Sequence, residues 1–267
     1  MKVDNLIRKE RLPFIWCPGC GNGTVLRATL TAIADLNLKE NDLIIVSGIG
    51  CSSRTPMYTK FDNAHSLHGR AIPLATGIKL TRPDKKVIVM TGDGDALAIG
   101  GNHLIHAARR NIDLTVIIFN NSIYGMTGGQ ISPLTPEGKK GTTAIMGNIE
   151  NKFDTVELLK GAGATYVARI GTYFFPQLTK YIKNGITHKG FSVIEVVTQC
   201  PVYYGRLNDM KTPGEMLLWQ KDNLISIEKA KNISQEELNE KIIIGEFVNI
   251  DKETYIEKRE KLISKAK

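Results

Sequence analysis

The stretch VIVMTGDGD, residues 87–95, joins an uninterrupted apolar run to a turn rich in glycine and aspartate, and a helical pattern follows over residues 99–110. Three other apolar runs, at residues 43–46, 114–119 and 193–197, also end close to glycine, asparagine or cysteine. Strands that are apolar on both faces and alternate with helices are typical of a parallel sheet covered on both sides. The sequence therefore predicts an α/β fold with a doubly wound, mainly parallel sheet.

Such sheets bind ligands at the carboxyl ends of their strands, and the unusual residues of this chain fall there. A second helix is predicted over residues 24–36, and a stretch rich in Gly, Pro and Thr over residues 130–150 predicts a long surface loop. We expect the strand pattern to stop after Gly205. The predicted organisation is an α/β domain over residues 1–205 and a helical extension over residues 206–267 that docks on a partner subunit.

Composition and charge narrow the class of protein. The chain has 267 residues, of which 42% are hydrophobic and 23% charged, and this excludes disordered, collagenous and coiled-coil classes. The net charge of +8 lies in segments of mixed charge, which predicts a solvated lysine-rich surface or an acidic protein partner, and no nucleic-acid partner. No run approaches the about 18 apolar residues of a membrane span. The charged N-terminus does not resemble a signal peptide, so we expect a cytoplasmic protein without a membrane partner.

Two predicted strands are each followed by a residue whose side-chain oxygen could bind a metal ion. Asp93 follows one of them, in a turn whose glycines, Gly92 and Gly94, allow backbone N–H groups to approach a phosphate closely. Asn121 follows the next strand and offers an amide oxygen, and the carbonyl of Ile123 can point to the same place. Three protein oxygens, two phosphate oxygens and a water would complete the octahedral shell of Mg²⁺. The alternative is a strand-to-helix turn with a purely structural role.

The four cysteines also fall where the ligand-bearing edge of the sheet is expected. Cys17 and Cys20 form a C-x-x-C pair in a loop rich in Gly and Pro, whereas Cys51 and Cys200 each follow a strand. Four converging thiolates suit a [4Fe–4S] cluster or a zinc ion. A redox-active dithiol, or cysteines with unrelated roles, is the third interpretation that the residues leave open.

Several segments of the chain form a set in a fixed order. They read WCPGCGNG (16–23), IGCS (49–52), HSLHGR (65–70), GDGD (92–95), GGNH (100–103) with RRNID (109–113), and NNSIYGMTGGQ (120–130). Together they resemble the beta subunit of 2-oxoacid:ferredoxin oxidoreductases, over roughly residues 14–205. The resemblance implies a fold of the type that binds the diphosphate half of thiamine diphosphate.

The resemblance also implies the site residues. The implied ligands of a [4Fe–4S] cluster are Cys17, Cys20, Cys51 and Cys200, and those of Mg²⁺ are Asp93, Asn121 and the carbonyl of Ile123. The residues implied to line the thiamine diphosphate are Ile49, Gly50, Cys51, Ser52, His68, Gly94, Asp95, Gly125 and Met126. His68 and Arg70 are expected to be catalytic, because an imidazole can donate to a phosphate or a substrate oxygen and an arginine suits a distal carboxylate. Lys139 and Lys140 are further candidates for that carboxylate.

The implied reaction is the oxidative decarboxylation of a 2-oxoacid with coenzyme A, run in either direction. The thiazolium ring acts as the electron sink and the cluster takes electrons one at a time. The motifs look most like subunits that act on 2-oxoglutarate, and Gly128, where several two-subunit relatives have lysine, suggests the four-subunit type. We therefore expect an alpha subunit that completes the active site, gamma and delta subunits, and ferredoxin as the electron acceptor.

Other hypotheses remain open at this point. The same chemistry on pyruvate or on a branched-chain or aryl 2-oxoacid is the nearest rival. A thiamine-dependent lyase or decarboxylase without electron transfer is another enzyme hypothesis. A zinc-stapled nucleotide-binding module without catalysis belongs to a different class, and bound zinc, rather than iron with acid-labile sulfide, would indicate it.

Overall fold

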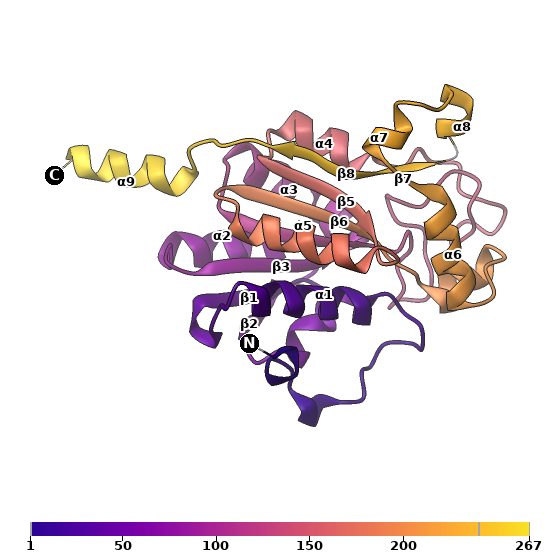
Figure 1. Ribbon diagram of the computed structural model, residues 1–267, viewed down its shortest axis with the longest axis horizontal. Helices are drawn as coiled ribbons and strands as arrows, with labels where there is room; N and C mark the ends of the chain where they lie inside the picture. The colour runs from indigo at the N-terminus through magenta and orange to yellow at the C-terminus, as the bar shows by residue number, and fades with distance from the viewer. Residues whose placement is uncertain (1, 240, 267) are drawn as a thin grey trace.

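The computed structural model describes residues 2–239 and 241–266. Within them an eight-stranded sheet has the order β2-β1-β3-β4-β6-β5-β8-β7 (Figure 1). All its pairs are parallel except β5 with β8, which are antiparallel. The strands are β1 (Leu43–Ser47), β2 (Asp62–His65), β3 (Lys86–Gly92), β4 (Leu114–Asn120), β5 (Tyr166–Gly171), β6 (Phe191–Val197), β7 (Leu224–Ser226) and β8 (Ile242–Asn249).

Helices cover both faces of this sheet (Figure 1). The helices are α1 (Asn22–Asp35), α2 (Ala71–Thr81), α3 (Gly101–Arg109), α4 (Thr155–Ala162), α5 (Phe175–Thr187), α6 (Pro213–Asn223), α7 (Ile227–Ala230), α8 (Gln235–Asn239) and α9 (Tyr255–Ala266). The apolar residues of α1 and α5 belong to one hydrophobic core, and those of α2, α3 and α4 belong to a second core. The sheet therefore lies between two apolar layers, and this is why β4 and β6 are buried along their whole length.

The predicted fold class is confirmed. The four predicted strands are β1, β3, β4 and β6, and each end lies within two residues of the expected position. The helix expected over residues 24–36 is α1. The helical pattern after the GDGD motif begins as a π-helical turn over Gly94–Ile99 and continues as α3. Such π-turns are frequent at functional sites.

The expectation that the strand pattern stops after Gly205 is wrong. Both β7 and β8 lie beyond that residue, and β8 pairs with β5 inside the common sheet. The segment 206–267 is therefore not purely helical, because its own strands extend the sheet of the preceding residues. At its end α9 projects from the body of the molecule (Figure 1). Docking of this segment on a partner subunit stays a prediction.

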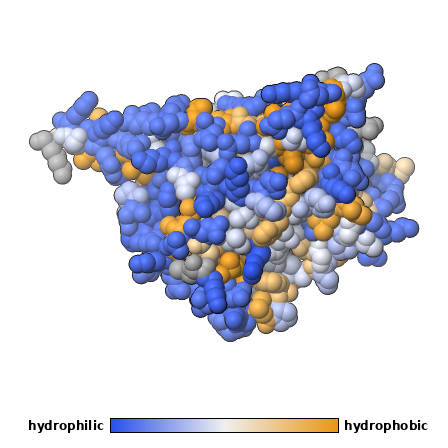
Figure 2. Space-filling view, viewed as in Figure 1, coloured by the Kyte–Doolittle hydropathy of each residue, from blue (hydrophilic) through white to orange (hydrophobic). Residues whose placement is uncertain are grey.

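The surface is mainly hydrophilic on the face that can be seen (Figure 2). Hydrophilic residues cover most of the face shown in Figure 2, with hydrophobic residues exposed between them. Among the residues that the structure describes, no helix combines the length and the apolar character that crossing a membrane requires.

Candidate functional site

The GDGD turn (residues 92–95) holds a buried carboxylate. Asp93 is 3% exposed, and its two oxygens accept the N–H of Gly94 at 3.0 Å and the hydroxyl of Ser132 at 2.7 Å. Burial raises the pKa of Asp93 to about 7, although these hydrogen bonds and the N–H of Ser122 oppose the rise. Within the described part of the chain, no cationic side chain forms an ion pair with it. A buried carboxylate in this state suits a metal cation, which would supply the missing positive charge.

The turn after β4 lies beside Asp93. Ser122 has a φ of 58°, in the left-handed region, and its N–H acts on the Asp93 carboxylate. The amide oxygen of Asn121 accepts the N–H of Ile123 at 3.2 Å, which fixes the amide within its own turn. The structure thus brings together the two turns that contain Asp93, Asn121 and Ile123. Their coordination of Mg²⁺ stays a prediction.

Asp95 connects three segments of the site. Its Oδ1 accepts the N–H of Gly69 at 2.7 Å and the N–H of Ile49 at 3.2 Å. The Nδ1 of His68 lies 2.7 Å from the same oxygen, and the hydroxyl of Thr91 donates to Oδ2 at 2.6 Å. Both carboxylate oxygens of Asp95 therefore have hydrogen-bond partners, and the residue is 3% exposed. Asp95 therefore positions the IGCS turn (49–52) and the HGR turn (68–70) against the end of β3.

His68 has one ring nitrogen left for a ligand. The carboxylate beside Nδ1 places the proton of the neutral ring on that nitrogen, so Nε2 carries the lone pair. The imidazole is 37% exposed and packs edge to face on Tyr124 with 6.2 Å between the ring centroids. The hydroxyl of Tyr124 lies 3.4 Å from the carbonyl of Gly94. His68 therefore stands beside the GDGD turn, where it was predicted to act.

Gly48 and Gly50 allow the IGCS turn to pass close to the GDGD turn. A Cβ atom at Gly48 would lie 1.9 Å from Oδ2 of Asp95, so no side chain fits between β1 and this carboxylate. Gly50 has a φ of 127°, in the region that favours glycine. Ser52, which follows Cys51, is buried.

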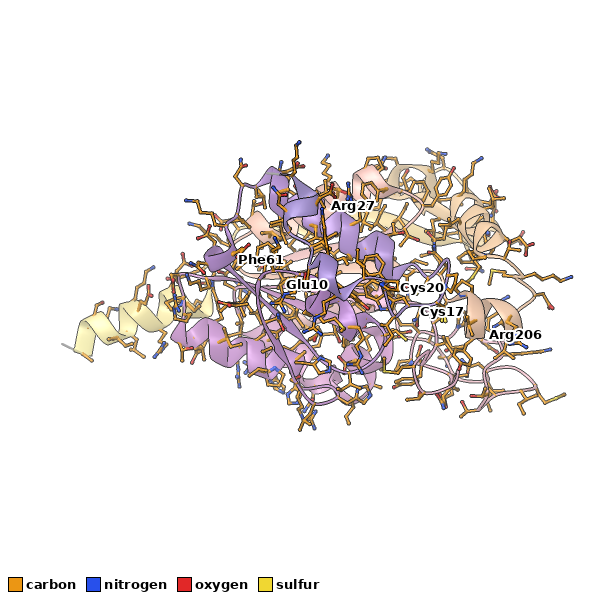
Figure 3. The ribbon with its side chains drawn as sticks, turned by 90° about the horizontal axis from the view of Figure 1, so that it is seen from below. Glu10, Cys17, Cys20, Arg27, Phe61 and Arg206 are labelled. Carbon is orange, nitrogen blue, oxygen red and sulfur yellow. The ribbon has the colours of Figure 1, made fainter. Side chains whose placement is uncertain are left out.

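The four cysteine thiols line one cavity of about 80 Å³, together with Asn121, Gly125 and Met126. We call it the cysteine cavity. Cys17 and Cys20 come from the loop that precedes α1 and lie near each other in Figure 3. Cys51 follows β1 and Cys200 follows β6. Three distant parts of the sequence thus meet here, at the carboxyl edge of the sheet.

Burial is the main cause of the pKa shifts of Cys20, Cys51 and Cys200. It raises the pKa of Cys20 to about 12 and that of Cys51 to about 11, and it raises the pKa of Cys200 as well. Neighbouring thiols raise these pKa values further, whereas backbone N–H groups such as that of Asn22 beside Cys20 lower them. Thiols with raised pKa values are poor nucleophiles, so Cys20, Cys51 and Cys200 are unreactive as free thiols.

The arrangement of the thiols bears on the group that they would hold. A zinc ion draws its sulfur ligands to about 2.3 Å from one point. Across residues 2–239 and 241–266, no three His, Cys, Asp or Glu side chains are grouped so that they could hold one ion. The four cysteines stand around one cavity. Their thiols are the ligand type that a [4Fe–4S] cluster takes, and the identity of the bound group stays a prediction.

Hydrogen bonds hold the C-x-x-C loop in place. The indole Nε1 of Trp16 donates to the carbonyl of Cys51 at 2.7 Å, and the Trp16 ring packs on Tyr58 with 5.1 Å between the centroids. The N–H of Gly21 donates to the carbonyl of Gln199 at 3.0 Å. The loop is thereby joined to the segments that carry both other cysteines.

Gly125 lies close to both the thiols and the turn after β4. A Cβ atom on Gly125 would lie 3.6 Å from the Sγ atoms of Cys51 and Cys200 and 3.9 Å from Nδ2 of Asn121. Asn121 itself lines the cysteine cavity, so the thiols and a candidate Mg²⁺ ligand border the same space.

Arg70, which was predicted to act in the site, and Arg54, which was not, have different surroundings. The guanidinium of Arg70 donates to the carbonyl of Ile99 at 3.3 Å, and Arg70 does not line the cysteine cavity; its catalytic role stays a prediction. Arg54, which the sequence reasoning did not single out, does line the cavity, and its charge lowers the pKa of Cys51. Its place three residues after Cys51, in the same turn, was the available signal.

Comparisons with known proteins agree with this geometry. Residues 48–196 match the family model described as "Thiamine pyrophosphate enzyme, C-terminal TPP binding domain". The chain is 58% identical to a 2-oxoglutarate synthase subunit KorB of Methanocaldococcus jannaschii over 98% of this chain and 97% of the relative. It is 47% identical to the subunit of the same name of Archaeoglobus fulgidus, over 96% of this chain and 92% of the relative.

A solved structure supports the same assignment. The 2-oxoglutarate:ferredoxin oxidoreductase from Magnetococcus marinus, with 2-oxoglutarate, coenzyme A and succinyl-CoA bound, contains a chain that superposes with a TM-score of 0.89. The identity is 31%, over 100% of this chain and 91% of that chain. Identity and coverage of this extent establish common descent as well as a common fold. The chain therefore belongs to the family of 2-oxoacid:ferredoxin oxidoreductase beta subunits that includes the KorB subunits of 2-oxoglutarate synthase.

Proposed function

We propose that this chain is the beta subunit of an enzyme that decarboxylates 2-oxoglutarate oxidatively, forms succinyl-CoA and CO₂, and passes two electrons to ferredoxin. One observation carries the proposal: Asn121, a proposed Mg²⁺ ligand, lines the cysteine cavity together with the four cysteines. The proposed site for decarboxylation and the proposed site for electrons would thus be neighbours. The names of the relatives, and the 2-oxoglutarate and coenzyme A bound in the Magnetococcus enzyme, support the choice of substrates.

The two turns at the ends of β3 and β4 are proposed to hold Mg²⁺ and the diphosphate. Asp93, Asn121 and the carbonyl of Ile123 would supply three oxygens, the hard ligands that Mg²⁺ prefers. When bound, thiamine diphosphate supplies the electron sink for the loss of CO₂. The buried state of Asp93 supports this assignment, because no cationic side chain among the described residues pairs with this carboxylate.

The cysteine cavity is proposed to hold one [4Fe–4S] cluster through Cys17, Cys20, Cys51 and Cys200. Such a cluster accepts electrons one at a time. The chain contributes the backbone N–H groups that oppose the raised pKa values of Cys20 and Cys200, and these donors would stabilise thiolate ligands.

Other residues of the chain are proposed to bind and orient. Asp95 fixes the tautomer of His68, whose Nε2 is then available to a diphosphate or substrate oxygen. Ile49, Gly50, Ser52, Gly94 and Met126 belong to the turns that would line the cofactor. Arg54 lines the cysteine cavity, so its charge would act on the cluster ligands. Arg70 stays the candidate for the distal carboxylate of 2-oxoglutarate.

The relatives are named as subunits, so a beta subunit works within a complex. We propose an alpha subunit that completes the active site, gamma and delta subunits, and ferredoxin as the acceptor. The basic surface suits an acidic electron-transfer partner.

The test uses the complex purified anaerobically with its partner subunits. We expect bound iron, acid-labile sulfide and thiamine diphosphate, and coenzyme A-dependent reduction of an electron acceptor with 2-oxoglutarate. Pyruvate and 2-oxoisovalerate, assayed side by side, should be much poorer substrates. Preference for either of them would keep the mechanism and refute the substrate. Zinc in place of iron, with no activity on any oxoacid, would favour a nucleotide-binding module and refute the proposal.

A further inference from the structure

The stretch ISPLT, residues 131–135, lies in the loop predicted to be a long surface loop, yet two of its hydroxyl side chains are buried. Ser132 is 5% exposed and Thr135 is 0% exposed. The hydroxyl of Ser132 donates to Oδ2 of Asp93 at 2.7 Å. The hydroxyl of Thr135 donates to the carbonyl of Ser122 at 2.6 Å. One short segment thus contacts both turns on which Mg²⁺ ligands are proposed to lie.

The remaining bonds fix the direction of both hydroxyls. A hydroxyl has one hydrogen, and that of Thr135 points to Ser122, so its oxygen accepts the N–H of Ser132 at 2.8 Å. The oxygen of Ser132 accepts the N–H of Leu134 at 3.3 Å, which leaves its own hydrogen for Asp93. The amide of Asn148 donates to the carbonyl of Thr135 at 2.8 Å and holds the segment from the other side.

We propose that Ser132 and Thr135 form a brace, a pair of positioning residues that sets the spacing of the two Mg²⁺-bearing turns. The inference rests on the proposed function, because it assumes that Asp93 and the turn after β4 hold the ion. Mg²⁺ demands near-ideal octahedral geometry at about 2.0–2.1 Å, so a small displacement of either turn weakens all its contacts. Outer groups that orient metal ligands typically change metal affinity by about 10–100-fold when they are removed.

The experiment titrates Mg²⁺ into the metal-depleted complex at a fixed concentration of thiamine diphosphate, and measures bound thiamine diphosphate by equilibrium dialysis. Ser132→Ala and Thr135→Val should each raise the half-saturating Mg²⁺ concentration by about 10–100-fold. In the double variant, the fold-increase in the half-saturating Mg²⁺ concentration should be smaller than the product of the two single increases, because both substitutions disrupt the same arrangement. Thr135→Ser keeps the hydroxyl and should restore the wild-type value.

A matched control is Ser192→Ala, on β6. Ser192 is a buried serine whose hydroxyl has no hydrogen-bond partner among the described residues, so its loss should leave the Mg²⁺ titration unchanged. Iron and acid-labile sulfide should remain at wild-type levels in every variant, which separates a local effect from misfolding. Ser132→Ala with reduced iron and reduced Mg²⁺ affinity together would indicate a general structural role and overturn the brace.

Two further results would also overturn the brace. One is wild-type Mg²⁺ dependence in Ser132→Ala and Thr135→Val while Asp93→Asn abolishes binding. The other is a double variant whose effect equals the product of the singles, which would show two independent bonds. If the wild-type complex bound no thiamine diphosphate at any Mg²⁺ concentration, the proposed function itself would fail.

Discussion

Replacing Arg169 by methionine should destabilise the fold strongly. Arg169 on β5 is 9% exposed, and Glu195 on β6 is 3% exposed. The Nε of Arg169 donates to Glu195 at 2.8 Å and its Nη2 donates to Asp154 at 2.8 Å. Asn120 is the other group that donates to Glu195, at 2.7 Å. Arg169→Met would leave Glu195 buried without a cation, and breaking a buried pair in this way costs about 3–5 kcal/mol.

A substitution of Asp154, the second carboxylate that binds Arg169, is the matched control. Asp154 has a side chain 55% exposed, and exposed pairs contribute about 0–1 kcal/mol. Asp154 also caps α4 by accepting the N–H of Val156 at 2.9 Å, and asparagine caps helices equally well. Asp154→Asn should therefore cost below about 1 kcal/mol.

Thermal unfolding of the purified complex would measure the difference. A change of 1 kcal/mol shifts Tm by about 2–4 °C in a domain of this size, so Arg169→Met should lower Tm by about 6–20 °C. Asp154→Asn should lower it by less than about 4 °C. Adding Glu195→Gln to Arg169→Met should raise Tm again, because it removes the unpaired charge. A Tm of Arg169→Met within error of the Asp154→Asn value would refute the reasoning.

Three predictions concern the site itself. Asp93→Asn should abolish Mg²⁺-dependent binding of thiamine diphosphate, measured by equilibrium dialysis, and retain the iron; unchanged affinity would remove Asp93 from the metal site. Cys17→Ser should lose iron and acid-labile sulfide and retain thiamine diphosphate, and an unchanged iron content would exclude Cys17 as a ligand. Arg70→Met should raise KM for 2-oxoglutarate at least about 10-fold, the effect of losing a charged hydrogen bond of 1.5–3 kcal/mol, with little change for pyruvate, whereas Arg54→Met, which alters the cysteine cavity, should not. Equal effects of Arg70→Met on both substrates would contradict its reading of the distal carboxylate.

The strands that could be predicted from the sequence are those that are recognisable from their own residues, without knowledge of the adjacent strands. The runs that became β1, β3, β4 and β6 are apolar and continuous, because both faces of the sheet are covered. β5 was missed because Arg169 interrupts its apolar run. That charge is tolerated only because Glu195 lies opposite on β6, a pairing seen only once the register is known. β2 was missed for another reason: it is a mostly exposed edge strand of polar residues.

In the site, too, the contacts that depend on the folding of distant segments could not be predicted from the sequence. The positions of Asp93 and Asn121 follow from the rule that parallel strands end at one edge, so both could be expected there. The contact of Ser132 with Asp93 could not, since it depends on how a loop 39 residues along the chain from Asp93 folds back onto it. Likewise, three of the four contacts of Asp95 come from Ile49, His68 and Gly69, which only the fold brings next to it.

The IGCS turn is hydrogen-bonded to residues of both sites proposed above. On one side the N–H of Ile49 donates to Asp95, the residue that also orients His68. On the other side the carbonyl of Cys51 accepts the indole of Trp16, next to the C-x-x-C pair. Neither bond involves a thiol or a proposed Mg²⁺ ligand. The turn is thus held from both directions by hydrogen bonds of the chain itself, and under the proposed function this arrangement would bring cofactor and cluster close together.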